Sequence, residues 1–147
     1  MVHLTDCIIE NNRSTATGNN HPLVEGAGLT NSGTFRTNQY RPTPGKAELT
    51  RTIVRNNIAT AIGPGSEVRG GGIANADQGT LTLTLSTVTG NTARASNPHG
   101  GGIYNFLNAI VQNPPRTVGT VTIDRSVVTA NSPNNCEPPG TIAGCTG

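Results

Sequence analysis

Residues 81–91 read LTLTLSTVTGN, and this stretch decides the fold of the chain. Apolar residues alternate with threonine until the alternation breaks at Leu85 and Ser86, and it resumes around Val88. A period of two residues is that of a β-strand, so the stretch predicts two short strands joined by a bend. Asn91 suits a corner, because asparagine tolerates the left-handed conformation and its amide can bond to nearby backbone.

The same eleven-residue frame occurs four times along the chain. Its copies begin at Val2, Ala47, Leu81 and Val121. Successive copies therefore lie 45, 34 and 40 residues apart. A second frame, Gly-x-Gly-apolar-x-Asn, falls between the copies, at residues 26–31, 70–75 and 100–105. A constant motif with a variable period is typical of a solenoid whose variation lies in its loops.

These two frames predict an all-β fold, a right-handed parallel β-helix solenoid of about four coils with three short strands per coil. The long frame supplies two strands, and the glycine frame supplies a third that is entered through residues able to take positive φ. Equivalent asparagines in successive coils, about 4.8 Å apart, are expected to form an amide ladder. A flat antiparallel sandwich is the alternative, but it would require hairpin turns such as Asn-Gly between alternating runs.

The pair of motifs GGGIYN at residues 100–105 and VTIDRSVVTAN at residues 121–131 carries a family resemblance. It resembles the repeats of bacterial secreted right-handed β-helix proteins, the pectate-lyase-like superfamily, and is similar to the repeats of polymorphic outer-membrane proteins. The latter carry phenylalanine where this chain has valine or isoleucine, for example Val88. The resemblance covers residues 2–131 and implies the β-helix fold. It implies no single activity, because the superfamily includes polysaccharide lyases and hydrolases, adhesins and passive stalks.

The composition excludes several classes of partner. The net charge is +2, 12% of residues are charged and no basic cluster is present, so nucleic acid is not an expected partner. No apolar run approaches membrane-spanning length, so membrane insertion is not expected. We expect one β-helix domain over residues 1–133 with an incomplete first coil, and a Pro/Gly-rich cap over residues 134–147. Because that first coil lacks a preceding glycine frame and no signal pattern is present, we expect upstream sequence.

The three cysteines fall into two contexts. Cys7 takes the small position that Thr52, Ser86 and Ser126 hold in the other frames, so it is interpreted as a buried free thiol. Cys136 and Cys145 lie in the Pro/Gly-rich tail, and we expect a short disulfide between them. Such a bond indicates an oxidising compartment, and therefore a secreted or cell-surface location. No further ligands at zinc-site spacing lie nearby, so we expect neither a metal nor another cofactor.

Equivalent positions in successive coils are neighbours in space, so columns of residues are the unit in which to search for a site. Glu25, Arg69 and His99 each immediately precede a glycine frame. A carboxylate, a guanidinium and an imidazole on one corner have the chemistry of a base, a charge stabiliser and an acid for glycan cleavage. His21 and Glu67 lie in the same class of loop and would enlarge the cluster. The alternative interpretation is a salt-bridged corner of purely structural character.

A second candidate site lies in the segments that follow the glycine frames. Two long segments flank a short one at residues 76–80, which predicts a notch on that edge. Aromatic rings, arginines and amides there suit sugar binding. The candidate ligand-binding residues are Phe35, Arg36, Tyr40, Arg41, Tyr104, Phe106 and Arg116. Aromatic side chains that pack back over the coil as a lid are the alternative.

Two further pairs follow from the alignment of the first two frames. Asp6 is brought beside Arg51, and Glu10 beside Arg55, which predicts ion pairs between the first two coils.

The function predicted from the sequence is an extracellular β-helix module with a structural or glycan-binding and adhesion role. Its expected partner is an extracellular polysaccharide or a cell-surface glycan. The alternative is a polysaccharide lyase or glycoside hydrolase fragment that uses Glu25, Arg69 and His99. We favour the non-enzymatic interpretation, because about four coils form a stack only about 19 Å long. End-to-end self-association through the N-terminal coil is also expected, because an uncapped coil exposes unpaired backbone groups.

Overall fold

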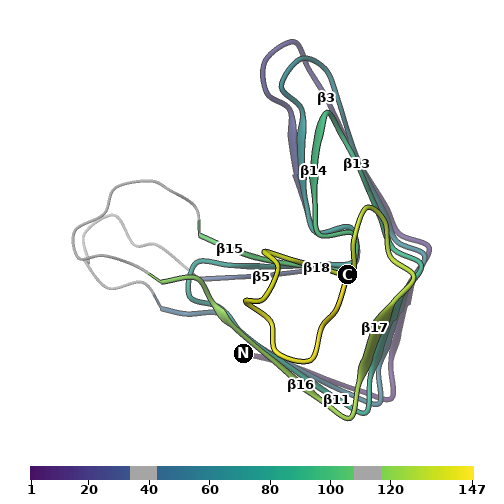
Figure 1. Ribbon diagram of the computed structural model, residues 1–147, viewed down its shortest axis with the longest axis vertical. Coiled ribbons are helices and arrows are strands. Elements are labelled where there is room, and N and C mark those ends of the chain that lie inside the picture. Colours follow the sequence, from purple (N-terminus) through teal and green to yellow (C-terminus); the bar gives the residue numbers. More distant parts are fainter. Residues whose placement is uncertain (34–42, 108–116) are drawn as a thin grey trace.

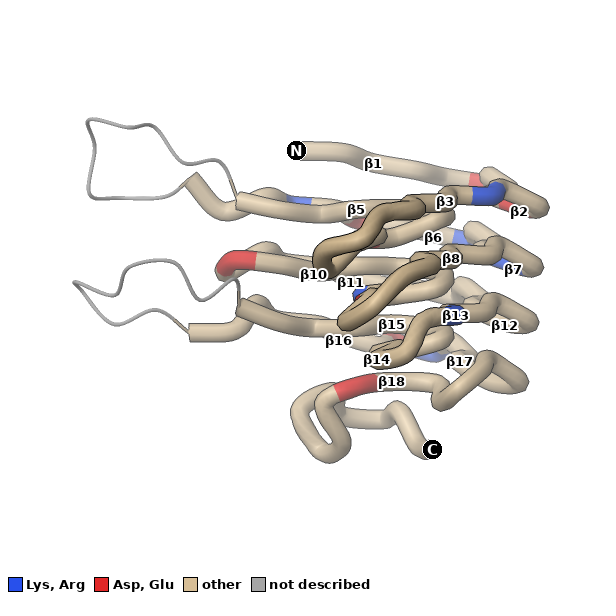
Figure 2. Tube along the Cα trace, turned by 90° about the horizontal axis from the view of Figure 1, so that it is seen from above, with Lys and Arg blue, Asp and Glu red and all other residues tan. Residues whose placement is uncertain are grey.

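The structure, a computed structural model, describes residues 1–33, 43–107 and 117–147. The regular secondary structure in these residues is entirely β-strand, arranged in five parallel sheets that wind around a common axis (Figure 1). In Figure 1 the chain turns counter-clockwise while it approaches the viewer, which is the right-handed sense. The fold is therefore the all-β parallel solenoid that the two frames predict, and Figure 2 shows its coils stacked as layers.

The long frame forms two of the five sheets. Sheet A contains β1 (Val2–Thr5), β6 (Lys46–Thr50), β11 (Thr80–Thr84) and β16 (Thr120–Asp124). Sheet B contains β2 (Ile8–Glu10), β7 (Ile53–Arg55), β12 (Thr87–Thr89) and β17 (Val127–Thr129). The register follows the aligned frames, because Leu81 pairs with both Ala47 and Val121.

The glycine frame forms the sheet that closes each coil. Sheet E contains β5 (Leu29–Ser32), β10 (Ile73–Ala76), β15 (Ile103–Phe106) and β18 (Cys136–Glu137).

Two further sheets, which the sequence did not predict, give the first three coils five strands each instead of three. Sheet C contains β3 (Arg13–Thr17), β8 (Ile58–Ile62) and β13 (Thr92–Arg94). Sheet D contains β4 (Leu23–Glu25), β9 (Glu67–Arg69) and β14 (Asn97–His99). Together they form an arm that projects from the coil (Figure 1). The arm has its own thin core of small residues, including Ala59, Ala61 and Val68. Because these side chains are short, the sequence shows little hydrophobic periodicity there, and the strands of the arm were not predicted.

The coils differ in their strand content. Counted from β1 to β5, the first coil contains all five strands, whereas the fourth coil lacks the arm. The segment between Asn131 and Asn135 is too short to form one, and it passes directly to β18. Strand β18 pairs with β15, so the first residues of the expected cap complete the fourth coil.

The solenoid interior combines an apolar column with two amide ladders. Leu49, Leu81 and Ile103 are almost fully buried in the main core. In the first ladder Asn12, Asn57, Asn91 and Asn131 are linked by Nδ2–Oδ1 hydrogen bonds of 2.8, 2.9 and 2.9 Å. In the second ladder Asn31, Asn75 and Asn105 are linked by bonds of 2.7 and 2.9 Å. These bonds satisfy amides that would otherwise be buried at a large cost in free energy.

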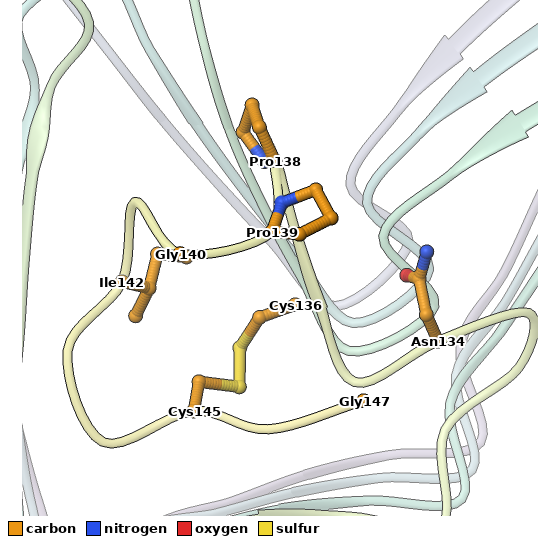
Figure 3. A pocket seen from close by; sticks show the side chains of 8 residues that line it. All are labelled: Asn134, Cys136, Pro138, Pro139, Gly140, Ile142, Cys145 and Gly147. Carbon is orange, nitrogen blue, oxygen red and sulfur yellow. A yellow bond between two sulfur atoms is a disulfide. The ribbon is translucent and has the colours of Figure 1, made fainter.

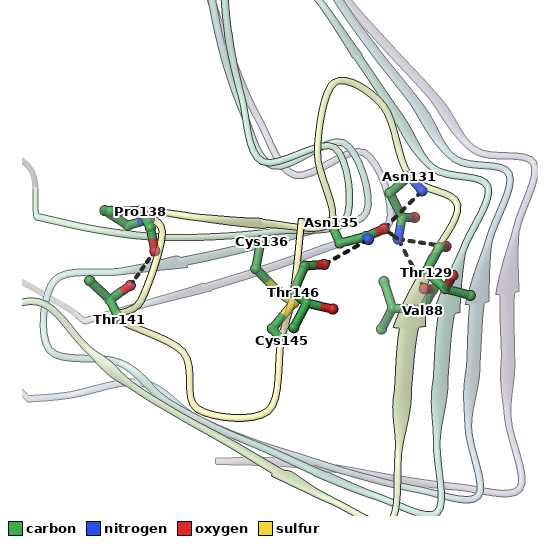
Figure 4. The surroundings of a disulfide bond; sticks show 9 residues. All are labelled: Val88, Thr129, Asn131, Asn135, Cys136, Pro138, Thr141, Cys145 and Thr146. Atoms are coloured by element: carbon green, nitrogen blue, oxygen red, sulfur yellow. Dashed lines mark hydrogen bonds between the residues drawn. A yellow bond between two sulfur atoms is a disulfide. The ribbon is translucent and has the colours of Figure 1, made fainter.

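A cap closes the C-terminal end of the solenoid. The disulfide between Cys136 and Cys145 is present, as expected, and it joins β18 to the last residues of the chain (Figure 4). Ile142 is 2% exposed and packs with Cys136 into the main core. The cap therefore covers the apolar column at this end.

Candidate functional site

Glu25, Arg69 and His99 lie side by side at the last positions of the sheet D strands. Arg69 pairs in register with Glu25 on one side and with His99 on the other. Val24 and Val68 lie one position earlier and point into the arm core, so the alternation of the strand turns the three functional side chains outward. Figure 1 shows this side of the arm meeting sheet E at a re-entrant angle.

Glycine makes this angle possible. Gly26, Gly70 and Gly100 have φ values of +60°, +82° and +55°. A Cβ atom on Gly70 would lie 2.3 Å from the carbonyl oxygen of Ile73, and the other two positions are equally crowded. Only glycine combines this conformation with such close backbone approach, so each glycine frame directs the chain from the arm into sheet E.

We call the side chains gathered at this angle the corner cluster. Its members are Glu25, Glu67, Arg69, His99, Tyr104, Phe106 and Glu137. They come from β4, β9, β14, β15 and β18.

Arg69 lies at the centre of the corner cluster. Its Nε and Nη2 donate to the two oxygens of Glu67 at 2.6 and 3.2 Å, and its Nη1 donates to Glu25 at 3.2 Å. Burial acts to lower the pKa of Arg69, but the hydrogen bonds and charges of Glu67 and Glu25 outweigh it and leave the pKa raised. The guanidinium carbon also lies 5.0 Å from the centre of the Phe106 ring, in a cation–π arrangement.

His99 connects the arm to the cap through Glu137. Its Nδ1 lies 2.7 Å from Glu137 Oε1, and the backbone nitrogen of Gly100 donates to Oε2 at 2.9 Å. Asn134 Nδ2 donates to the same carboxylate at 3.1 Å. Burial acts to raise the pKa of Glu137, but these donors together hold it below the ordinary glutamate value. The Nε2 atom of His99 lies 3.9 Å from Glu67, so the imidazole has a carboxylate on each side.

The aromatic residues of the cluster are stacked on one another. The Tyr104 ring lies 5.0 Å from His99 and 4.8 Å from Phe106, at interplanar angles of 14° and 13°. Both faces of Tyr104 are therefore covered, and Phe106 is only 4% exposed. Burial, followed by the charge of Glu137, raises the pKa of the Tyr104 phenol. A sugar ring can therefore approach the edge of the Tyr104 ring but not its faces.

Of the residues expected to enlarge the cluster, Glu67 belongs to it and His21 does not. His21 is exposed, and its ring nitrogen lies 3.2 Å from Asn20 Oδ1. Glu137 was missed from the sequence, because it lies in the cap, outside both frames. The structure shows that Cys136 and Glu137 form the strand that takes the place of a fourth glycine-frame strand.

The second candidate site is only partly described. Tyr104 and Phe106 belong to the corner cluster, whereas Phe35, Arg36, Tyr40, Arg41 and Arg116 lie outside the described residues. The short segment between the two long ones is a tight turn, in which Asp77 and Gln78 have φ values of 52° and 64°.

The expected ion pairs between the first two coils are present. Arg51 Nε lies 2.6 Å from Asp6, and Arg55 Nε lies 2.6 Å from Glu10. All four side chains are well exposed. We interpret them as contacts that favour the correct register between coils.

A small pocket of about 190 Å³ lies in the cap and not at the corner cluster (Figure 3). Its walls are the disulfide, Pro138, Pro139, Ile142 and nearby residues of the tail. The Oδ1 atom of Asn134, which lines this pocket, is buried and has no hydrogen-bond partner among the described residues. Within the described ranges no group of three His, Cys, Asp or Glu side chains is arranged to hold a metal ion. The same residues contain no helix long and apolar enough to cross a membrane.

Comparisons of the chain with family models, with curated proteins and with solved structures give no match. The structure itself shows stacked parallel sheets, which are compatible with a β-helix, and its disulfide is compatible with an extracellular location.

Proposed function

We propose that this chain is an extracellular β-helix module with a structural and glycan-binding role, and that it does not cleave its ligand. One observation carries the proposal: the acid–base groups of the corner cluster are bonded to one another. Arg69 is held by Glu67 and Glu25, and His99 is held by Glu137. A guanidinium engaged in this way is not free to neutralise a substrate carboxylate, and the Nδ1 atom of His99 is already paired with a carboxylate.

The charge of the cluster indicates the kind of glycan. The corner cluster contains three carboxylates and one guanidinium: Glu25 and Glu67 pair with Arg69, and Glu137 pairs with His99. An excess of negative charge repels uronate-rich polysaccharides and favours neutral or amino sugars. The Tyr104 hydroxyl and the carboxylate oxygens offer hydrogen bonds to hydroxyl and amino groups of a sugar. The side chains of the three glutamates are 21–27% exposed.

The test is a glycan array that contains neutral, amino-sugar and uronate polysaccharides, combined with an assay for new reducing or unsaturated ends. We expect binding to neutral or amino sugars without cleavage. Tyr104→Phe, which removes only the hydroxyl, is expected to weaken binding several-fold, by about 1 kcal/mol. Asp6→Asn, a change at the ion pair with Arg51 on another corner, is the matched control and should leave binding unchanged.

The alternative function is cleavage of a polysaccharide by Glu25, Arg69 and His99. New chain ends that disappear in His99→Ala, while Asp6→Asn retains them, would establish this alternative and reject the proposal. Absence of binding to every glycan on the array would reject the glycan role and leave only the structural one.

A further inference from the structure

We propose that the pocket in the cap is a binding site for a small organic ammonium ion, which donates a hydrogen bond to the Oδ1 atom of Asn134. The proposal does not depend on the glycan role of the corner cluster. It rests on an acceptor without a partner, on the composition of the pocket wall and on the charge of Glu137.

The acceptor is the side-chain oxygen of Asn134. It is buried and, within the described part of the chain, it has no hydrogen-bond partner. Figure 3 shows this oxygen on the side of the amide that faces Cys136 and Pro139. A buried polar group without a partner costs about 1–3 kcal/mol, so a donor bound in the pocket would recover free energy.

The orientation of the Asn134 amide is fixed by Glu137. The amide nitrogen donates to Oε2 of this carboxylate at 3.1 Å. If the oxygen and nitrogen of the amide changed places, two acceptors would meet, so the oxygen has to lie on the other side. The bond to an anion also polarises the amide, and this makes its oxygen a stronger acceptor.

The wall of the pocket supplies apolar surface and few donors. Pro138 and Pro139 have no N–H group, and the N–H of Cys145 is already bonded to the carbonyl oxygen of Ile142 at 3.2 Å. The proline rings, the Ile142 side chain and the disulfide provide apolar contact. A ligand that suits this wall therefore donates hydrogen bonds and has a compact apolar body.

The negative charge beside the pocket favours a cationic donor. Burial acts to raise the pKa of Glu137, but the donors around it hold the pKa below its ordinary value of 4.5, so the carboxylate is ionised at neutral pH. A hydrogen bond from a charged donor is roughly twice as strong as one from a neutral donor.

The size of the pocket limits the ligand. A volume of about 190 Å³ corresponds to about six water molecules, which suits an amine with a short branched alkyl chain. The pocket is open on one side, so the remaining N–H groups of the ammonium stay in contact with water.

The pocket is also held in shape by the fold. The disulfide closes residues 136–145 into a ring that contains both prolines and Ile142. Because Ile142 is anchored in the main core, the ring is fixed at a second point. Little ordering is therefore required when a ligand binds.

The test uses isobutylammonium as the probe and follows the backbone amides of the chain by NMR. We expect saturable shifts within residues 134–145. Isobutanol has a donor without a charge and should bind about fivefold more weakly or worse. Isobutyrate reverses the charge, and tetramethylammonium is a cation without an N–H group, so neither should produce these shifts.

Substitutions in the chain test the two groups that select the ligand. Asn134→Leu removes the acceptor and should lower the affinity for isobutylammonium about tenfold or more. Asn19→Leu, the same change at the exposed tip of the arm, is the matched control and should leave the affinity unchanged. Glu137→Gln should weaken the binding of isobutylammonium but not of isobutanol. The melting temperature shows whether each variant is folded, and the four probes test the unmodified chain without any substitution.

Three results would overturn the proposal. They are the absence of saturable shifts within residues 134–145, equal shifts with isobutyrate or tetramethylammonium, and unchanged affinity in folded Asn134→Leu. Shifts confined to the amides of His99 and Tyr104 belong to the first result, because the ammonium would then pair with the corner cluster and not with the pocket.

Discussion

At the scale of single residues, the corners of the coil determine which side chains are tolerated. The bend between sheets A and B has positive φ in every coil, with values of 55°, 48°, 51° and 46° at Asp6, Arg51, Leu85 and Arg125. Asparagine and aspartate suit this conformation, whereas a leucine there experiences the steric penalty of the left-handed region. Leu85 is also 47% exposed, so its side chain gains little from packing.

Leu85→Asn is therefore expected to stabilise the protein by about 1 kcal/mol. Leu85→Ala keeps a Cβ atom without the asparagine preference, so it serves as the matched control and should give no such gain. Urea unfolding monitored by circular dichroism measures the difference. A loss of stability in the asparagine variant would mean that Leu85 contributes more through packing than it loses through strain.

The ladder residues show the opposite behaviour, because they are buried and mutually dependent. Asn91→Ala removes the acceptor for both nitrogen donors of Asn57, and it removes the donor to Asn131. We expect a loss of about 3 kcal/mol in the free energy of unfolding. Asn56→Asp, at an exposed neighbouring position whose φ of 54° both residues tolerate, should cost less than about 1 kcal/mol. Similar losses at both positions would contradict the ladder interpretation.

At the scale of elements, the sequence predicted the strands that depend on short-range patterns. It missed the contacts that depend on residues far apart along the chain. The strands of sheets A and B and the glycine frame were predicted, because alternation and turn residues act over a few positions. The arm was missed, because its core uses alanines such as Ala59 and Ala61 that burial alone distinguishes. Glu25, Arg69 and His99 were placed together by column alignment, whereas Glu137 joins them only through the path of the cap, which no local pattern encodes.

The contact between cap and arm is expected to make stability depend on pH. The pKa of Glu137 is lower in the folded protein than its ordinary value of 4.5, so the unfolded chain takes up the proton first. This stabilisation is complete above about pH 4.5 and is lost as the pH falls through the folded-state pKa. Glu137→Gln should therefore reduce the fall in unfolding free energy between neutral and acid pH. An unchanged pH dependence would refute this, although a residual slope from Asp6 and Glu48, whose pKa values are also lowered, is expected in both proteins.

The disulfide should contribute to the stability of the cap. We expect Cys136→Ser with Cys145→Ser to lower the free energy of unfolding by about 2 kcal/mol. A reducing agent should lower the melting temperature of the unmodified protein but not that of this double variant. Cys7→Ser removes the free thiol only and should leave the response to reduction intact.

At the scale of the whole molecule, each coil contacts only its neighbours, so stability is distributed along the axis. Coils two and three have a neighbour on each side, the fourth has the cap, and the first has a neighbour on one side only. We expect amide hydrogen exchange to be slowest in β6, β7, β11 and β12 and fastest in the strands of the first coil. Uniform protection along the axis would indicate a single cooperative unit instead.

The parallel stacking of the coils also determines how the molecule responds to mechanical load. The hydrogen bonds between coils run along the solenoid axis, so a force along the axis opens the layers one after another and meets few bonds at a time. A force along the strands of sheets A and B has to shear the bonds of a whole sheet together. The protein should therefore be soft in one direction and resistant in the other, and the points at which it is attached to its surroundings decide which behaviour it shows.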